Sequence, residues 1–438
     1  MSTREPTRTG RRFAVVGGGI SGIAAAHRLH RAGHEVELVE ADHVLGGRMG
    51  FDSLGDRAIM MGGKNIGRRY TRLRAFVDES GGAEYEPFGI NSSQVVDGTV
   101  RTLDDPGVIG LVRYLLSVGR RPDIARMLFY GAQVKLAERN RYLGAPFFAR
   151  TASARDHEPI TRYFGSRLCA GVLRPMTLRL NAAEPGEIYL GTFGVHLGMV
   201  LDRYDQLVHG FQPIVEALAR KITVRLGTEA IRVVRQENRV TGLELAHGPG
   251  ATTLRDYDGV VLATPAAAAA RILADDLPEA SALLREVAYF PSTVAVVEYD
   301  REIFGTRIRS LAFDSGPCSA AGVYGIADRH LVRYTFSGAA ARPVPSEATL
   351  AEWIDTAEKQ VCRLLGTAPA QRLRIRTRSW PAAHCAYVPD HGRFLRRLGT
   401  HIAAVPGLEL AGDYQRGAQL EACYRSGAEA AARLTETD

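Results

Sequence analysis

The stretch that decides the fold is residues 13–40, FAVVGGGISGIAAAHRLHRAGHEVELVE. It opens with an apolar run over residues 13–16, which predicts a short buried strand of a parallel sheet. The Ala-rich residues 23–31 are apolar at helical spacing and predict a helix. A second apolar run over residues 35–39 predicts another strand, and the acidic Glu40 follows it. The predicted order is therefore strand, glycine-rich turn, helix, strand and acid.

Three glycines between the first strand and the helix fit the pattern GxGxxG, which binds dinucleotides in this setting. Gly17 allows the tight turn, Gly19 lets a pyrophosphate approach the backbone, and Gly22 lets helix and strand pack closely. The helix N-terminus offers free N–H groups and a positive dipole end to the phosphates. Glu40 is placed to accept hydrogen bonds from the ribose hydroxyls. A structural turn without a ligand is the alternative. The first helical residues join the predicted site: Ile20 and Ser21.

The residues that follow the second strand indicate which dinucleotide is bound. Residues 44–48 read VLGGR, which resembles the GG-R continuation of flavoproteins with the two-domain, glutathione-reductase-like FAD fold. In that family the glycine pair and the arginine lie beside the FAD pyrophosphate, which implies this place for Gly46, Gly47 and Arg48. The planar fork of an arginine suits phosphate oxygens. The alternative is an ordinary loop arginine, because all but four of the 55 Lys and Arg residues are arginines.

The C-terminal residues 406–434 carry a further motif, PGLELAGDYQRGAQLEACYRSGAEAAARL. A predicted strand ends at Gly412 and Asp413, and a loop and an Ala-rich helix follow. This stretch resembles the C-terminal FAD motif of the amine oxidase, protoporphyrinogen oxidase and phytoene desaturase superfamily. The resemblance implies that Asp413 faces the ribityl and pyrophosphate groups, and that the backbone of Leu420 and Glu421 faces the pyrimidine edge of the flavin. A helix N-terminus there stabilises the negative charge that develops on flavin reduction.

The central residues 222–265 alternate between strand patterns and polar turns, and they resemble the middle segment of the same superfamily. The resemblance implies that the backbone of Ile231 contacts the adenine, and a buried strand residue is the alternative. Three FAD segments imply an α/β fold, in which a glutathione-reductase-like, FAD-binding Rossmann domain is interleaved with an α+β substrate-binding domain. The FAD-binding domain is expected to comprise residues 1–76, 205–284 and 392–438. The substrate-binding domain is expected to comprise residues 77–204 and 285–391.

The two inserted segments differ in their predicted secondary structure. The first is expected to be mostly helical, with helices over residues 106–120, 123–140 and 160–173. Ser153 and Asp156 give it a capping-box-like helix start. The second contains strand patterns such as STVAVVEYD and HLVRYTFSG.

A further glycine-rich stretch, Gly62-Gly63-Lys64-Asn65, stands where the superfamily has a loop that runs past the flavin. The resemblance places Gly62 and Gly63 at the cofactor and makes Lys64 a candidate catalytic residue. If Lys64 is partly buried, its pKa falls and it can act as a base. Alternatively it stays charged and binds a carbonyl or carboxylate, or it is a surface lysine.

Residues 379–391, SWPAAHCAYVPDH, resemble the stretch of the superfamily that runs beside the flavin. Trp380 is expected to pack near the ring system and Tyr387 to line the substrate side, which makes both candidate catalytic residues. The alternative is that both belong to the hydrophobic core with a satisfied polar tip. The same ambiguity applies to three neighbours: His384, Cys385 and His391.

One departure from the amine oxidase pattern indicates which branch of the superfamily the chain resembles. Many amine oxidases carry a lysine on the strand after the middle segment, where it holds a water against flavin N5. The corresponding residues 289–300, YFPSTVAVVEYD, contain no lysine. We therefore expect the chain to lie closer to the protoporphyrinogen oxidase and desaturase side.

The resemblance implies an FAD-dependent oxidoreductase that dehydrogenates a small organic substrate by hydride transfer to flavin N5, with O2 as the expected oxidant. An amine, an amide or a natural-product intermediate of secondary metabolism is the expected substrate. A carotenoid- or porphyrinogen-type desaturase or oxidase and a redox-neutral isomerase are the alternatives.

The composition excludes several other classes of protein. Apolar residues make up 45% and charged residues 24%, which argues against disorder and a disulfide scaffold. The net charge of +7 permits a nucleic-acid partner, but the excess of arginine over lysine is typical of GC-rich codon usage, so none is expected. Five scattered cysteines predict a reducing cytoplasm and no metal site. Neither a signal peptide nor an integral membrane segment is expected, and a homodimer is a candidate assembly.

Overall fold

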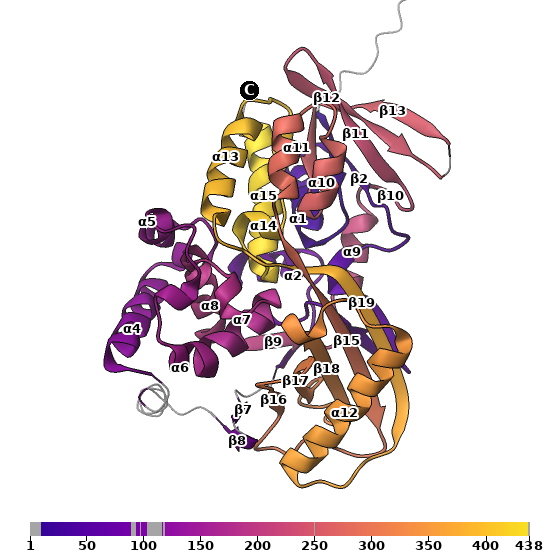
Figure 1. The fold of residues 1–438 in the computed structure, drawn as a ribbon. Coiled ribbons are helices and arrows are strands. Elements are labelled where there is room, and N and C mark those ends of the chain that lie inside the picture. Colours follow the sequence, from indigo (N-terminus) through magenta and orange to yellow (C-terminus); the bar gives the residue numbers. More distant parts are fainter. Residues whose placement is uncertain are drawn as a thin grey trace, which may run out of the picture.

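The computed structural model describes residues 10–88, 93–96, 98–102, 116, 119–248 and 250–436. The fold is mixed α/β, and Figure 1 shows two regions, each with its own sheet, one above the other in the view. The long strands β15 (Tyr289–Tyr299) and β19 (Arg372–Cys385) run between the two regions. A group of helices from α4 (Arg121–Leu136) to α8 (Phe193–Val200) lies to one side of the lower region.

The upper region contains a parallel sheet of five short strands in the order β10-β2-β1-β14-β20. Its strands come from the start, the middle and the end of the chain, and every neighbouring pair is parallel. Both faces are covered, so the inner strands are mostly apolar, and all four residues of β14 are buried. The bounds are β1 (Arg12–Val16), β2 (Glu35–Val39), β10 (Thr223–Arg225), β14 (Gly259–Leu262) and β20 (Leu408–Leu410).

Helix α1 (Ile20–Arg31) lies unusually close to the turn before it and to helix α15 (Leu420–Glu436). A Cβ atom at Gly22 would stand only 1.8 Å from the carbonyl oxygen of Gly17. A Cβ atom at Gly427 would stand equally close to the carbonyl oxygen of Ser21. Only glycine permits these approaches, which join the two ends of the chain at one point.

A smaller antiparallel sheet and several helices flank the parallel sheet. The small sheet has the order β11-β12-β13, and strand β11 bulges between Ala230 and Arg232. Its bounds are β11 (Glu229–Gln236), β12 (Arg239–Ala246) and β13 (Thr252–Asp256). The flanking helices are α2 (Thr71–Glu79), α9 (Gln212–Ala219), α10 (Ala266–Ile272), α11 (Pro278–Arg285) and α13 (His391–Ala403).

The lower region is built on a seven-stranded sheet in the order β19-β15-β18-β17-β16-β7-β8. Its pairs are antiparallel except for that of β16 with β7. Helix α12 (Glu347–Leu365) packs on one face over an apolar cluster that includes Tyr334 and Phe336. The remaining strands are β7 (Gln94–Val96), β8 (Thr99–Arg101), β16 (Ser310–Ala312), β17 (Cys318–Val323) and β18 (Leu331–Ser337). The strand-rich prediction for residues 285–391 is therefore confirmed in outline.

Shorter strands and helices complete the fold. The strands are β3 (Phe51–Leu54), β4 (Arg57–Met60), β5 (Ile66–Gly67), β6 (Tyr85–Pro87) and β9 (Tyr204–Leu207). The helices are α5 (Pro146–Ser153), α6 (Ser166–Leu168), α7 (Arg174–Asn181) and α14 (Asp413–Arg416).

The predicted helices of the first inserted segment have mixed outcomes. The helix over 123–140 corresponds to α4 and a following short turn of helix. The helix over 160–173 is wrong as a single element, because it is broken into short pieces. At the break, Gly165 is extended and its N–H donates to the carboxylate of Asp123 (3.2 Å). Most of the predicted helix over 106–120 lies outside the described residues.

The predicted helix start at Ser153 is also wrong. Ser153 is the last residue of α5, and its hydroxyl donates to the carbonyl oxygen of Arg150. Asp156 instead accepts a hydrogen bond of 2.6 Å from the N–H of Arg393, in the first turn of α13. The acid therefore stabilises a helix start more than 230 residues away in the chain, which local spacing does not reveal.

Candidate active site

The turn between β1 and α1 has the form of an anion cradle. Gly17 has φ 103°, a left-handed conformation that suits glycine. The space beside Gly19 is open, since a Cβ placed there would meet no atom within 4 Å. No side chain caps the start of α1, and no acid lies in its first turn, which includes Ile20 and Ser21. The start of α1 therefore keeps N–H groups without a side-chain cap, and with the positive end of the helix dipole they suit a pyrophosphate.

Glu40 stands at the end of β2, beside this cradle. Its Oε2 accepts from the N–H of Gly18 (2.6 Å) and its Oε1 accepts from the N–H of Asp42 (2.8 Å), so the carboxylate is held in one orientation. The nearby Ile231 lies at the bulge of β11 and is 39% exposed. The alternative, that Ile231 is simply a buried strand residue, is therefore wrong. At the bulge, Ile231 is not paired with a residue of β12.

The GG-R loop folds back onto the cradle. The N–H of Gly46 donates to the carbonyl oxygen of Gly18 (2.9 Å), and Gly47 lies against Gly19. Arg48 then extends to Asp413, with 2.7 Å between Nη1 and Oδ2. Its Nη1 also donates to a carbonyl oxygen of strand β19 (3.1 Å).

Asp413 is the first residue of α14, shortly after β20, and is only 3% exposed. Its second oxygen accepts from the hydroxyl of Tyr289 (2.9 Å) and from the N–H of Tyr414 (3.1 Å). Burial by itself raises the pKa of Asp413, but the charge and hydrogen bond of Arg48 outweigh it, so the pKa lies below its ordinary value. Asp413 is therefore ionised at neutral pH. Its neighbour Gly412 donates its N–H to Ser426 Oγ (3.1 Å).

The start of α15 brings Leu420 and Glu421 to different places. The Leu420 side chain lies beside Gly63, where an added Cβ would be 3.3 Å from its Cδ2. The Glu421 side chain is fully buried and accepts from the backbone N–H groups of Arg72 (3.1 Å) and Leu73 (2.8 Å) in α2. The Glu421 carboxylate thus caps another helix, which leaves only its backbone for the implied flavin contact.

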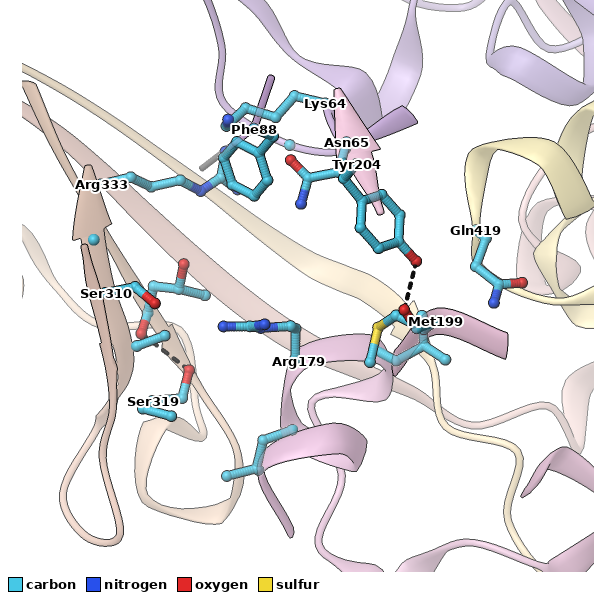
Figure 2. A pocket seen from close by; sticks show the side chains of 18 of the residues that line it. Lys64, Asn65, Phe88, Arg179, Met199, Tyr204, Ser310, Ser319, Arg333 and Gln419 are labelled. Atoms are coloured by element: carbon cyan, nitrogen blue, oxygen red, sulfur yellow. Dashed lines mark hydrogen bonds between the residues drawn. The ribbon is translucent and has the colours of Figure 1, made fainter. Parts of the chain in front are cut away.

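A cavity of about 670 Å³ lies between three parts of the chain. These are residues 48–70, the helical group and the seven-stranded sheet. Several residues from the sequence prediction line it together. Figure 2 shows side chains that converge on it from helices, from β18 and from the loop that carries Lys64 and Asn65. The predicted residues that line the cavity are Arg48, Gly62, Gly63, Lys64, Trp380, His384 and Leu420.

Lys64 is buried, at 5% exposure, and is therefore not a surface lysine. Its Nζ donates to the carbonyl oxygen of Tyr324 (2.8 Å) and to Oε1 of Gln206, and it lies 3.6 Å from the centre of the Phe88 ring. Burial, together with the charge of Arg333, holds the pKa of Lys64 well below its ordinary value. Lys64 thus meets the physical condition for a base, although two of its bonds go to protein acceptors.

The two aromatic candidates differ in their placement. Trp380 lines the cavity and packs against Gly50, where an added Cβ would be 2.8 Å from its ring. Tyr387 is 1% exposed, does not line the cavity, and donates its hydroxyl to the carbonyl oxygen of Asp413 (2.7 Å). The expectation that Tyr387 lines the substrate side is corrected accordingly: a buried tyrosine needs a hydrogen-bond partner, and here that partner lies in the core.

His384, Cys385 and His391 also differ in whether they line the cavity. His384 lines the cavity, and burial, followed by the charge of Arg48, lowers the pKa of its imidazole to about 4. Cys385 is fully buried. His391 is 4% exposed, and its Nε2 lies 2.9 Å from the carbonyl oxygen of Tyr414. Only His384 therefore belongs to the cavity, as a neutral imidazole at pH 7.

Sequence reasoning missed several residues of the cavity. Arg179 of α7, Arg333 of β18 and Tyr204 of β9 line it, with Phe88 and Met199 beside them. Among so many arginines, no local pattern distinguishes Arg179 or Arg333.

A parallel sheet with a glycine cradle at a helix start, together with a large cavity, is typical of an enzyme that binds a dinucleotide. The family model described as "Flavin containing amine oxidoreductase" matches residues 20–435, so the chain belongs to this family, whose members bind FAD. It is an enzyme, an FAD-dependent oxidoreductase of the amine oxidase superfamily.

Individual relatives are distant but cover nearly the whole chain. A coproporphyrinogen III oxidase of Mycobacterium leprae is 25% identical and covers 95% of this chain and 96% of its own length. A cyclohexylamine oxidase from Brevibacterium oxydans has a similar structure, with a TM-score of 0.74, 19% identity and coverage of 98% and 99%. A triple mutant of putrescine oxidase gives a TM-score of 0.78 at 16% identity, with coverage of 98% and 99%.

Within the described part of the chain, no helix is long and apolar enough to cross a membrane. No cluster of three or more His, Cys, Asp or Glu side chains there is arranged to hold a metal ion.

His391 generates a testable pH dependence. Burial lowers the pKa of His391 to about 4, below the 6.5 of an exposed histidine. The unfolded chain therefore binds the proton first, so the stabilisation is complete above pH 6.5 and is lost as the pH falls towards 4. We expect His391 to contribute about 2–3 kcal/mol to the loss of unfolding free energy between pH 7 and 4.5. Denaturant titrations of the wild type and His391→Gln at both pH values measure it; an unchanged pH dependence in the variant contradicts it.

Proposed function

We propose that FAD lies along the C-terminal edge of the parallel sheet, and that the chain dehydrogenates a small organic substrate in the adjoining cavity. The observation that carries this proposal is the cavity lining, in which Gly63 and Leu420 from the cofactor motifs stand with Trp380 and the polar side chains of the second region. Bound FAD supplies the hydride acceptor, and O2 is its proposed oxidant. A natural-product intermediate of secondary metabolism, an amine or an amide is the proposed substrate.

The proposed cofactor site uses the residues in named roles. The cradle at Gly17, Gly19 and the start of α1 holds the pyrophosphate with backbone N–H groups. Glu40 accepts from the ribose hydroxyls, and the bulge at Ile231 offers free backbone to the adenine. Gly46, Gly47 and Arg48 approach the pyrophosphate, while Gly412 and Asp413 approach the ribityl chain. The start of α15 directs its N–H groups at the pyrimidine edge, where negative charge develops.

The domain division follows from the same assignment. We place the glutathione-reductase-like FAD-binding domain in residues 1–76, 205–284 and 392–438, and the substrate-binding domain in 77–204 and 285–391. All five strands of the parallel sheet fall in the first set, and all seven strands of the large sheet fall in the second. The five free cysteines suit a reducing cytoplasm.

On the substrate side, the chain's residues position the substrate and exclude water. Trp380 forms an apolar wall, and the neutral His384 offers either a donor or an acceptor. Lys64, with its lowered pKa, takes or returns a proton at Nζ when the substrate requires it.

A porphyrinogen-type substrate is the second candidate. It is favoured by the coproporphyrinogen III oxidase relatives and by the absence of lysine in β15, the strand that follows the middle segment.

Anaerobic bleaching of the flavin by amines, amides, polyenes and porphyrinogens tests both candidates, and bleaching by none of them contradicts both.

Glu40→Ala tests the cofactor site. Loss of the carboxylate removes the proposed ribose contacts, so we expect a folded protein that retains less than a tenth of its FAD. Flavin absorbance after gel filtration and far-UV circular dichroism measure the two properties. Glu352→Ala, in the exposed face of α12, is the control. Full FAD retention by the Glu40 variant would place the adenosine elsewhere.

Lys64→Met tests the catalytic role of the lysine. We expect single-turnover flavin reduction to slow by about tenfold or more, equivalent to about 1.4 kcal/mol in the barrier, while FAD stays bound. Stopped-flow absorbance with a bleaching substrate measures the rate. Lys135→Met, an exposed lysine of α4, is the matched control. An unchanged rate in the Lys64 variant leaves the lysine with a structural role only.

A further inference from the structure

The cavity that the proposed function assigns to the substrate is strongly basic. Among the residues that the structure describes, its lining contains one acid, Asp202, whose carboxylate already accepts from the N–H of Arg203 (2.9 Å). The basic residues of the lining are Arg48, Lys64, Arg68, Arg179, Arg203, Arg309 and Arg333.

Several of these basic side chains already form ion pairs or hydrogen bonds within the protein. Arg48 pairs with Asp413 (2.7 Å), and Arg68 pairs with Asp205 (3.1 Å). Lys64 donates to a carbonyl and an amide oxygen and lies over an aromatic ring. The acids near Lys64 are also paired, because Glu86 and Asp328 both accept from Arg57.

Arg179 has no such partner. Its guanidinium makes no hydrogen bond or ion pair with any residue that the structure describes. Its side chain is exposed because it opens into the cavity, and the surrounding protein lowers the pKa of Arg179 below its ordinary value. Figure 2 shows the side chain extended from α7 into the cavity, towards the strands that carry Ser310 and Ser319.

Arg333 is the second cation without a counter-charge. It makes one hydrogen bond, from Nη1 to the carbonyl oxygen of Met60 (3.0 Å), and no ion pair with a carboxylate of the described chain. Burial lowers the pKa of Arg333 to about 10, so it remains charged at pH 7. It enters the cavity from β18, on the face opposite α12.

Arg333 is half-buried and Arg179 is exposed to the cavity, and neither charge has a carboxylate partner among the residues that the structure describes. An anion in the cavity would pair with both charges. The FAD phosphates do not serve this purpose in the proposed site, because they lie at the cradle of Gly17 and Gly19 in the other region. The anion must therefore come with the substrate.

We propose that Arg179 and Arg333 bind a carboxylate group of the substrate, so that this enzyme oxidises an organic acid rather than a cationic amine. The planar guanidinium fork matches the two oxygens of a carboxylate, and a carboxylate is ionised at neutral pH. A protonated amine is repelled by the same lining. The proposal rests on the proposed function, since it identifies the substrate class of that cavity.

The test uses FAD-loaded enzyme and sets of matched probes. Each set contains an acid, its primary amide and the corresponding amine, built on phenylpropyl, naphthylmethyl and decyl groups. Isothermal titration at pH 7.5 measures affinity. For at least one set we expect the acid to bind tenfold or more tightly than the amide, with the amine weaker still. Equal affinity of acid and amide in every set, or binding by no acid, overturns the proposal.

Substitutions test whether Arg179 and Arg333 cause the preference for the acid probe. Arg179→Gln and Arg333→Gln are expected to reduce the acid-to-amide preference by tenfold or more, and Arg179→Lys to retain part of it, because the charge remains while the planar fork is lost. Arg167→Gln, an exposed arginine of α6, is expected to change nothing. Unfolding midpoints and FAD content confirm that each variant is folded and loaded. A preference unchanged in both Gln variants overturns the assignment.

The outcomes separate this proposal from the proposed function. An enzyme that holds FAD and is bleached by a substrate, but prefers no acid, refutes the carboxylate site alone. A chain that takes up no FAD refutes the proposed function, whatever it binds.

Discussion

The structure depends on the ion pair between the buried Asp413 and the partly exposed Arg48. The two residues lie 365 positions apart, and Tyr289, the first residue of β15, donates to the other oxygen of the same carboxylate. A carboxylate that is 3% exposed carries a large desolvation penalty when it lacks partners. The loop after β2, the end of β20 and the start of β15 must therefore assemble together. Arg48 follows Gly47, which lies against Gly19 of the cradle, and Arg48 also lines the cavity, so the ion pair links these two parts of the structure.

The seven-stranded sheet separates the apolar core from the cavity by the alternation of its side chains. In β18, Tyr334 and Phe336 point into the cluster beneath α12, whereas Arg333 and Thr335 line the cavity. A shift of one residue in register would exchange the two sets. The packing of α12 thus fixes which side chains of β18 line the cavity. Arg179 approaches from α7 on the opposite side, so both cations depend on how the helical group and the sheet are placed.

The outcome of each sequence prediction follows from the range of the interactions involved. The first strand, turn and helix were predicted within a few residues, because glycine sterics and apolar periodicity act locally. The helix over 160–173 failed at Gly165, whose N–H is held by Asp123 in another helix. Asp156 looked like a local cap but caps α13. Tyr387 looked like a substrate contact, yet its hydroxyl finds the carbonyl of Asp413 in the core.

The sequence by itself determined the cofactor class and the parallel sheet, because the cradle, the acid after β2 and the C-terminal motif are each encoded in one short stretch. Only the tertiary structure decided the chemistry of the cavity. Lys64 has a lowered pKa because residues far from it in sequence bury it. Arg179 and Arg333 resemble every other arginine in the sequence until the fold places them in one cavity, where no carboxylate of the described residues pairs with them. Burial and the pairing of charges are properties of the whole fold, and no local pattern records them.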